Sequence, residues 1–171
     1  VIFSGRRHVA GHPVSLECFV LPGGSLIHLF CTGAEEVTNP PPAGAPPPFR
    51  RIARGLSEPM GLAVADGRIF VTEKNEVTEL IDADGDGRFE TYRCVTHDWP
   101  CTMDNHEYLF GAVVRDSHLY FSASVAMGYR GLDNRQAPLR GSVFKAHLDT
   151  GRTELVAGGL RSPDGIGFGP H

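Results

Sequence analysis

Two segments that lie far apart in the chain share the pattern Gly-Leu-x-x-Pro-x-Gly followed by an apolar run. They are GLSEPMGLAV at residues 55–64 and GLRSPDGIGF at residues 159–168. Between them, LFGAVVRDSHLYFSAS at residues 109–124 repeats the form of GLAVADGRIFVTE at residues 61–73, an apolar run, a polar turn and a second apolar run. Such self-similarity is typical of repeat architectures, and its spacing predicts a structural unit of about 50 residues.

Each unit is predicted to contain four short antiparallel strands. The runs are apolar or β-branched and are bounded by the Gly, Asp and Asn residues that favour tight turns. No segment shows the periodicity of a convincing amphipathic helix. The expected strands are 61–65, 69–73, 77–81 and 89–95 in one unit, and 109–114, 119–124, 142–148 and 153–158 in the next.

An all-β fold with repeated four-stranded units is typical of a β-propeller, in which blades pack around a channel. A β-sandwich of many short strands is the main alternative, but it requires no repeat. We expect about three blades of a propeller that has six in full, and therefore a fragment of a longer protein. The expected parts are a degenerate blade at 14–55 with a proline-rich loop at 39–48, blades at 56–95 and 96–158, and the start of another blade at 159–171.

The composition argues against some classes of partner. The 171 residues include 16 basic and 20 acidic ones, a net charge of −4, and no basic cluster. Nucleic acid is therefore not an expected partner. No apolar run approaches the roughly 20 residues that span a bilayer. Cys94 and Cys101 flank the short loop VTHDWP, which could be closed by a disulfide or could leave two free thiols.

Alternation of strand direction predicts which loops share a face of the propeller. The links between blades, at 56–60, 96–108 and 159–163, should emerge on one face. His106 and Arg161 precede the first strands of successive blades there, and the long loop that contains Arg130 should overhang them. A histidine can accept a proton and an arginine can hold an oxygen, which suits oxidation of an alcohol. Alternatively, His106 bonds a neighbouring turn and Arg161 pairs with Asp164.

The loop DADGDGRFE resembles the beginning of a calcium loop, with oxygen ligands at alternate positions and a glycine at the bend. Its twelfth position is Arg93 rather than glutamate, so it is not an EF-hand. A small calcium site and a solvated acidic turn are both open. The expected ligands, on the face opposite His106, are Asp82, Asp84, Asp86 and Glu90.

Three segments resemble the glucose/sorbosone dehydrogenase-like propellers, in particular the secreted bacterial members that are often fused to a c-type cytochrome domain. They are GLSEPMGLAVADGRIFVTEKNEVTELIDADGDGR, NHEYLFGAVVRDSHLYFSAS and GLRSPDGIGFGP, and the resemblance covers roughly residues 49–171. It implies a six-bladed propeller that uses pyrroloquinoline quinone (PQQ) and calcium to oxidise sugars. It also implies a periplasmic or extracellular location, and a cytochrome c domain or another electron acceptor as partner.

The resemblance assigns roles to individual residues. His106 falls on the general base, and Arg161 falls on the arginine that contacts the quinone. Asn105, Ser162 and Arg130 complete the expected cofactor contacts. The chain departs from the family at the end of the second strand, where Val125 stands near the position of a carboxylate, and at Ser162, which replaces an asparagine.

Two other functions remain open at this stage. A non-catalytic propeller could bind carbohydrate or present a docking face to a redox domain. A calcium-dependent lactonase would use the same architecture but needs several oxygen ligands at the channel, which makes it the weaker alternative.

Overall fold

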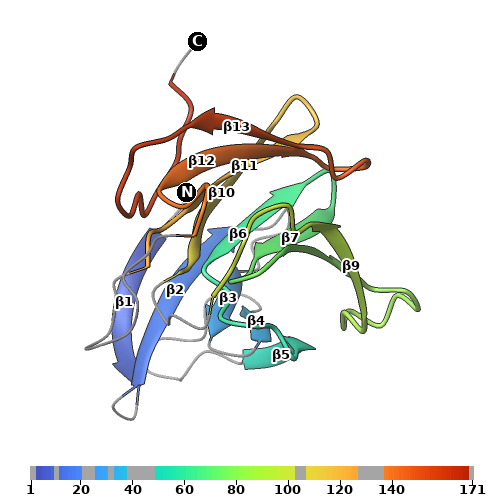
Figure 1. Cartoon of the computed structure of the whole chain (residues 1–171). Coiled ribbons are helices and arrows are strands. Elements are labelled where there is room, and N and C mark those ends of the chain that lie inside the picture. The colour runs from blue at the N-terminus through green and yellow to red at the C-terminus, as the bar shows by residue number, and fades with distance from the viewer. Residues whose placement is uncertain are drawn as a thin grey trace.

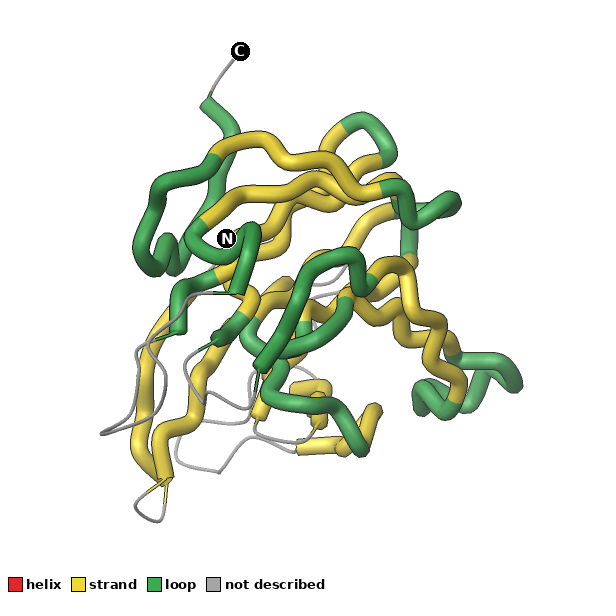
Figure 2. Tube along the Cα trace, in the orientation of Figure 1, coloured by secondary structure: helices red, strands yellow, loops and turns green. Residues whose placement is uncertain are grey.

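The regular structure of the described residues is entirely β-strand. The computed structural model describes residues 3–9, 12–20, 26–30, 33–37, 49–102, 107–126 and 137–169, with side chains from residue 51 onward. Within these segments there is no helix (Figure 2), so the predicted all-β class is confirmed. It follows that the described segments include no helix long and apolar enough to cross a membrane.

The strands form three antiparallel sheets in which neighbours in sequence are also neighbours in the sheet (Figure 1). The first sheet consists of β1 (Phe3–Val9), β2 (His12–Val20), β3 (Leu26–Phe30), β4 (Gly33–Val37) and β5 (Phe49–Arg54). The second consists of β6 (Gly61–Ala65), β7 (Arg68–Thr72), β8 (Val77–Ile81) and β9 (Thr91–Thr96). The third consists of β10 (Leu109–Arg115), β11 (His118–Ala123), β12 (Ser142–His147) and β13 (Thr153–Ala157).

The two predicted four-stranded units are confirmed as separate sheets with the expected strand order. Their first hairpins turn alike, because Asp66 and Gly67 have φ of 50° and 76°, and Asp116 and Ser117 have φ of 50° and 60°. Two successive residues with positive φ are typical of the type I′ turn, whose twist matches that of the flanking strands. The repeat in sequence is therefore a repeat in backbone conformation.

The N-terminal sheet differs from the prediction. The segments SLECFVLPGGSLIHLFCTG and FRRIARG predict two strands and one strand, which correspond to β2, β3 and β5, and the structure adds β1 and β4. The sequences of these two, FSGRRHV and GAEEV, are largely polar. Backbone hydrogen bonds to β2, β3 and β5 hold β1 and β4 in the sheet. Strand propensity alone does not predict strands that depend on such pairing.

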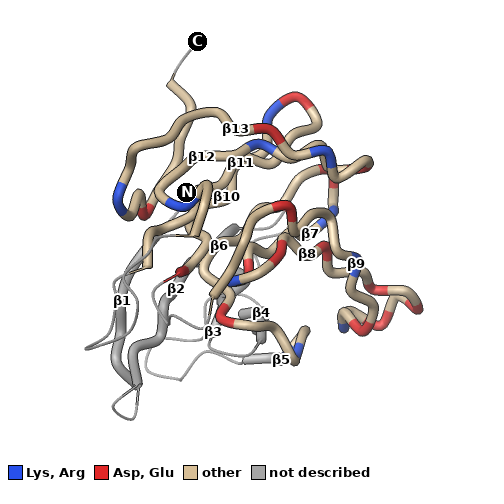
Figure 3. The backbone as a smooth tube through the Cα atoms, in the orientation of Figure 1, with Lys and Arg blue, Asp and Glu red and all other residues tan. Residues whose placement is uncertain are grey.

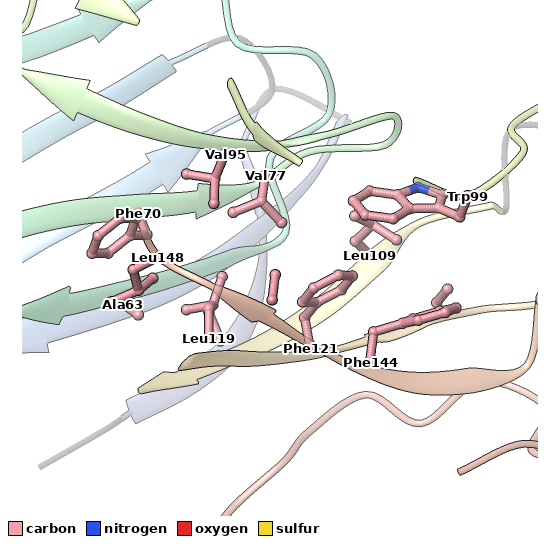
Figure 4. Close-up of a cluster of buried hydrophobic side chains, with 13 residues drawn as sticks. Ala63, Phe70, Val77, Val95, Trp99, Leu109, Leu119, Phe121, Phe144 and Leu148 are labelled. Atoms are coloured by element: carbon pink, nitrogen blue, oxygen red, sulfur yellow. The ribbon is translucent and has the colours of Figure 1, made fainter. Parts of the chain in front are cut away.

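The second and third sheets share a hydrophobic core (Figure 4). Phe70 and Val77 from the second sheet and Phe121 and Phe144 from the third are all at most 2% exposed. Trp99, in the connection between the sheets, lies 5.0 Å from Phe121 between ring centroids. Burying each aromatic ring contributes up to about 3 kcal/mol, so this core fixes the two sheets against one another.

The second sheet is covered on its other face as well. Ile69 and Val71 alternate with Phe70 on β7 and join a separate buried cluster with Ile52 of β5 and Leu56. Successive side chains of a strand point to opposite faces, so β7 is buried on both sides. The second sheet therefore lies between the end of the first sheet and the third.

One polar contact between consecutive units is repeated. The hydroxyl of Thr72, at the end of β7, donates to the carbonyl of Leu109, where β10 begins, at 3.2 Å. The hydroxyl of Ser122, at the equivalent place on β11, donates to the carbonyl of Pro163 at 2.6 Å. The chain that follows the third sheet therefore contacts that sheet in the same way as the start of β10 contacts the second sheet.

The segment that was expected to begin another blade forms no strand within residues 158–169. It nevertheless lies against the third sheet: Ile166 faces Gly111, and the ring of Phe168 packs edge-on against Tyr120 at 4.9 Å. A strand requires a ladder of backbone partners, and the described residues provide this segment with isolated contacts in place of a ladder. Residues 158–169 therefore contribute no strand to a further blade, although they contact the third sheet.

Candidate functional site

The links into β6 and β10 and the segment at 159–163 lie at corresponding ends of their sheets, which we call the entrance ends. Gly61 pairs with Thr72 at the end of β7, and Leu109 pairs with Ala123 at the end of β11. The hydroxyl contacts of Thr72 and Ser122 bring the next link to the same ends. Residues just before β10 and residues 159–163 therefore occupy equivalent positions on neighbouring sheets.

Three of the predicted site residues, Asn105, His106 and Arg130, lie outside the described residues. The flanking residue Glu107 is described, and its Oε2 accepts a hydrogen bond from the backbone N–H of Thr102 at 2.5 Å. This bond joins the two ends of the short link that contains Asn105 and His106. The base of that link is therefore held by a buried carboxylate.

Arg161 and Ser162 lie at the entrance end of the third sheet with exposed side chains. Their backbone is held in place, because the carbonyl of Arg161 accepts from the N–H of Val125 at 3.0 Å and the neighbouring carbonyl of Pro163 accepts from Ser122. A fixed backbone with an exposed arginine and hydroxyl can present hydrogen-bond donors to a ligand.

Arg140 is a buried cation at this end that the sequence did not reveal. It is 8% exposed, and its Nε, Nη1 and Nη2 have no hydrogen-bond partner in the described part of the chain. Burial lowers the pKa of Arg140, while the nearby carboxylate of Glu107 opposes that shift. The fully buried Oε1 of Glu107 and the Nε1 of Trp99 also lack partners there. Arg140 and Glu107 are therefore oppositely charged neighbours at this end, each with buried atoms that lack a hydrogen-bond partner in the described residues.

A cavity of about 300 Å³ opens at the entrance end of the second sheet. Glu73 is its buried acid, 4% exposed, with Oε2 accepting from the backbone N–H of Ser57 and Oε1 lying 2.6 Å from the hydroxyl of Thr78. Burial raises the pKa of Glu73, and the negative charge of Glu76 adds to this effect. The lining residues are Arg54, Gly55, Leu56, Ser57, Glu73, Asn75, Glu76, Thr78 and Tyr92.

The acidic loop lies at the opposite end of the second sheet, as predicted, because it follows Ile81 and precedes Thr91, which pair with each other. One oxygen from each of Asp82, Asp84 and Asp86 lies within 4.8 Å of the others. Glu90 is turned to the backbone, where its Oε1 accepts from the N–H of Ala83 at 2.9 Å. Figure 3 shows the acidic residues gathered beside β9.

The same carboxylates also organise the loop itself. Both oxygens of Asp82 accept backbone N–H bonds, from Gly85 at 2.8 Å and from Gly87 at 2.9 Å, and both glycines have positive φ. Three converging carboxylates fit the oxygen donors that calcium prefers, and they equally fit an acidic turn stabilised by its own side chains.

Cys94 and Cys101 are free thiols, both exposed. The disulfide that their spacing allowed is therefore not formed in this structure.

The sequence did not single out Glu73, Glu107 or Arg140. For Glu73, the signal was an acid placed immediately after an apolar run that ends at a turn. Arg140 has no comparable local signal, because its burial depends on the packing of segments distant in the sequence, such as the one that contains Glu107.

In comparisons with known proteins, no protein-family model matches this chain and no curated protein matches it.

Proposed function

We propose that the three sheets are consecutive blades of a β-propeller, and that the protein is a quinone-dependent sugar dehydrogenase of the glucose/sorbosone dehydrogenase type. The same hydroxyl-to-carbonyl hydrogen bond joins the second sheet to the start of β10 and the third sheet to the segment that follows it, and this repetition supports the radial arrangement. A β-sandwich packs two sheets face to face and provides no reason for the same hydroxyl-to-carbonyl contact to recur. In this proposal, the entrance ends surround the mouth of a central channel.

The roles of the residues follow from their places at this mouth. His106, before β10, would accept the proton of the sugar hydroxyl, and Arg161, one unit later, would hold the oxygen that becomes a carbonyl. Asn105, Arg130, Arg161 and Ser162 would hold pyrroloquinoline quinone. The donors of Arg161 and Ser162 are chemically suited to quinone and carboxylate oxygens, and both side chains are exposed at the end where the cofactor would bind. The quinone, when bound, supplies an acceptor for the hydride.

Calcium would be held by Asp82, Asp84 and Asp86, with Glu90 supporting the loop through its bond to Ala83. Because this loop lies at the end opposite the entrance, the ion would brace the β8–β9 connection and take no part in oxidation. An exported location and a cytochrome c domain as electron acceptor belong to the same proposal.

The test is reconstitution of the full-length protein with pyrroloquinoline quinone and calcium, followed by dye reduction with a panel of aldoses. We expect quinone binding, seen by absorbance, and sugar-dependent dye reduction that His106→Ala abolishes without loss of quinone binding. His97→Ala, in an exposed position on the link after β9, is the matched control. Quinone binding without turnover would favour a non-catalytic carbohydrate-binding propeller, and no quinone binding at all would overturn the proposal.

A further inference from the structure

The hydroxyl of Thr78 lies between two carboxyl groups at the cavity of the second sheet. Its Oγ1 is 2.6 Å from Oε1 of Glu73 and 2.9 Å from Oε1 of Glu76. Both distances are those of hydrogen bonds between oxygens. A hydroxyl has a single proton to donate, and ionised carboxylates only accept. If both glutamates were ionised, one of these two close contacts would contain no proton.

The missing proton belongs on Glu73. This residue is 4% exposed, whereas Glu76 is only half-buried. Burial disfavours the charged form of a carboxyl group, and the neighbouring negative charge of Glu76 disfavours it further. The hydrogen bonds that Thr78 and the N–H of Ser57 donate to the ionised carboxylate act in the opposite direction. Protonation of Oε1 reverses the bond with Thr78, and Oε2 still accepts from Ser57.

We propose that Glu73 and Glu76 share a single proton through the hydroxyl of Thr78, so that the wall of the cavity contains a proton-binding site. Oε1 of Glu73 donates to Oγ1 of Thr78, which donates to Oε1 of Glu76. All three contacts, including that of Ser57, are then satisfied with the geometry observed. The inference concerns residues other than those assigned to sugar oxidation, and it stands whether or not that proposal holds.

The surroundings of the pair contain other groups that titrate or carry charge. Burial raises the pKa of the Cys94 thiol on β9, and the negative charge of Glu76 raises it further. Lys74, in the same turn, forms a 3.6 Å ion pair with Glu58, which partly neutralises it. Arg54, at the end of β5, lines the same cavity. Glu73 and Glu76 remain the two acids that Thr78 joins.

Loss of the proton has a defined structural result. Thr78 can then donate to only one carboxylate, and the other faces an oxygen lone pair at close range. Glu73 is enclosed, so Glu76 is the side chain that moves, toward the cavity that it lines. The proton therefore keeps the side chain of Glu76 hydrogen-bonded to Thr78.

The effect on stability has a definite sign. The pKa of Glu73 is raised in the folded protein above its ordinary value of 4.5. Its contribution to stability is fully present below that ordinary value and is lost as the pH rises through the raised value. Glu73→Gln replaces the protonated carboxyl by a neutral amide that can donate to Thr78 and accept from Ser57.

The test is a titration of the side-chain carboxyl carbons by ¹³C NMR on the whole chain. We expect Glu73 to titrate above the other glutamates, and Glu76→Gln to lower its midpoint, because an amide at residue 76 can donate to Thr78 and release that hydroxyl to Glu73. Glu154→Gln, on β13 of the third sheet, should leave the midpoint of Glu73 unchanged.

A second measurement uses denaturant unfolding as a function of pH. Glu73→Gln should remove the decline in stability that the wild-type group causes as the pH rises. A wild-type Glu73 that titrates in the ordinary range would overturn the proposal, as would a midpoint that Glu76→Gln leaves in place. If Glu73→Gln does not fold, the wild-type and Glu76→Gln titrations alone decide the question.

Discussion

Gly61 and Gly111 approach each other so closely that a Cβ built on Gly61 would lie 2.7 Å from the carbonyl oxygen of Gly111 and 2.4 Å from Oγ1 of Thr72. The two glycines occupy equivalent positions in β6 and β10. The lack of a side chain at Gly61 lets the first strands of neighbouring sheets come together, and Thr72 bonds to Leu109 beside it.

Gly61→Ala should therefore destabilise the protein by about 1–3 kcal/mol, the usual cost of inserting a methyl group into packed structure. Denaturant unfolding of the two proteins measures the difference. Gly165→Ala is the control, because its φ is ordinary and a Cβ there would meet nothing within 4 Å. Equal stability of Gly61→Ala and the wild type would contradict the close approach of these strands.

Phe121→Ala should be among the most damaging single truncations in the described core. The ring is fully buried and contacts Trp99 and Phe144, with 5.6 Å between its centroid and that of Phe144. We expect a loss of about 3–5 kcal/mol in unfolding free energy from lost burial and the cavity left behind. Phe168→Ala, at a ring that is 43% exposed, should cost clearly less. Similar losses in the two variants would show that the shared core is not where the stability lies.

Glu79 should make the protein sensitive to acid. Its burial raises its pKa, but bonds from Arg68 at 2.7 Å and from Arg93 at 2.7 Å outweigh this effect and hold the pKa below the ordinary 4.5. The stability that it contributes is present above pH 4.5 and is lost as the pH falls through the lowered value. Glu79→Gln should cost on the order of 1–2 kcal/mol at pH 7, since both arginines are partly exposed.

The check for Glu79 is the difference in unfolding free energy between wild type and Glu79→Gln, measured from pH 7 down to pH 3. This difference should shrink as the pH falls. A difference that stays constant with pH would mean that the charge of Glu79 is not what stabilises the contact. Glu154→Gln on β13 provides a comparison, because the side chain of Glu154 is 44% exposed, whereas that of Glu79 is 8% exposed.

Cys94 should react slowly with iodoacetamide although it is exposed. Burial of its sulfur, and then the charge of Glu76, raise the pKa of the thiol to about 11. The thiolate is the reactive form, so the alkylation rate should still be increasing at pH 10. Peptide mapping by mass spectrometry separates Cys94 from the other cysteines. A rate that reaches its plateau near pH 9 would exclude the raised pKa.

The strands of the second and third sheets could be predicted from sequence because local signals agreed there. Apolar runs, the Asp-Gly turn at Asp66 and the matching turn at Asp116 each indicated the same hairpins. β1 and β4 could not be predicted in this way, because polar residues such as Glu35 and Glu36 form strands only through pairing with a neighbour. The loop of Asp82, Asp84 and Asp86 was predictable for the same local reason as the hairpins.

The polar groups of the candidate sites were less accessible to sequence reasoning. Thr78 is an ordinary strand residue until the turn places Glu73 and Glu76 on either side of it. Arg140 is buried in the folded protein, and the carboxylate of Glu107 lies near it. Both arrangements depend on tertiary contacts, and the residue types alone do not specify them.

The hydrogen bonds from Thr72 and Ser122 to the segments that follow their sheets also imply an order in which the units fold. The carbonyl of Leu109 can accept its hydrogen bond only after β7 has formed and positioned Thr72. In the same way, the carbonyl of Pro163 can accept only after β11 has formed and positioned Ser122. A ribosome releases the N-terminal units first, so each newly synthesised segment meets a surface that is already formed. Cotranslational folding in this order would let the growing chain add one unit at a time, without waiting for distant segments to arrive.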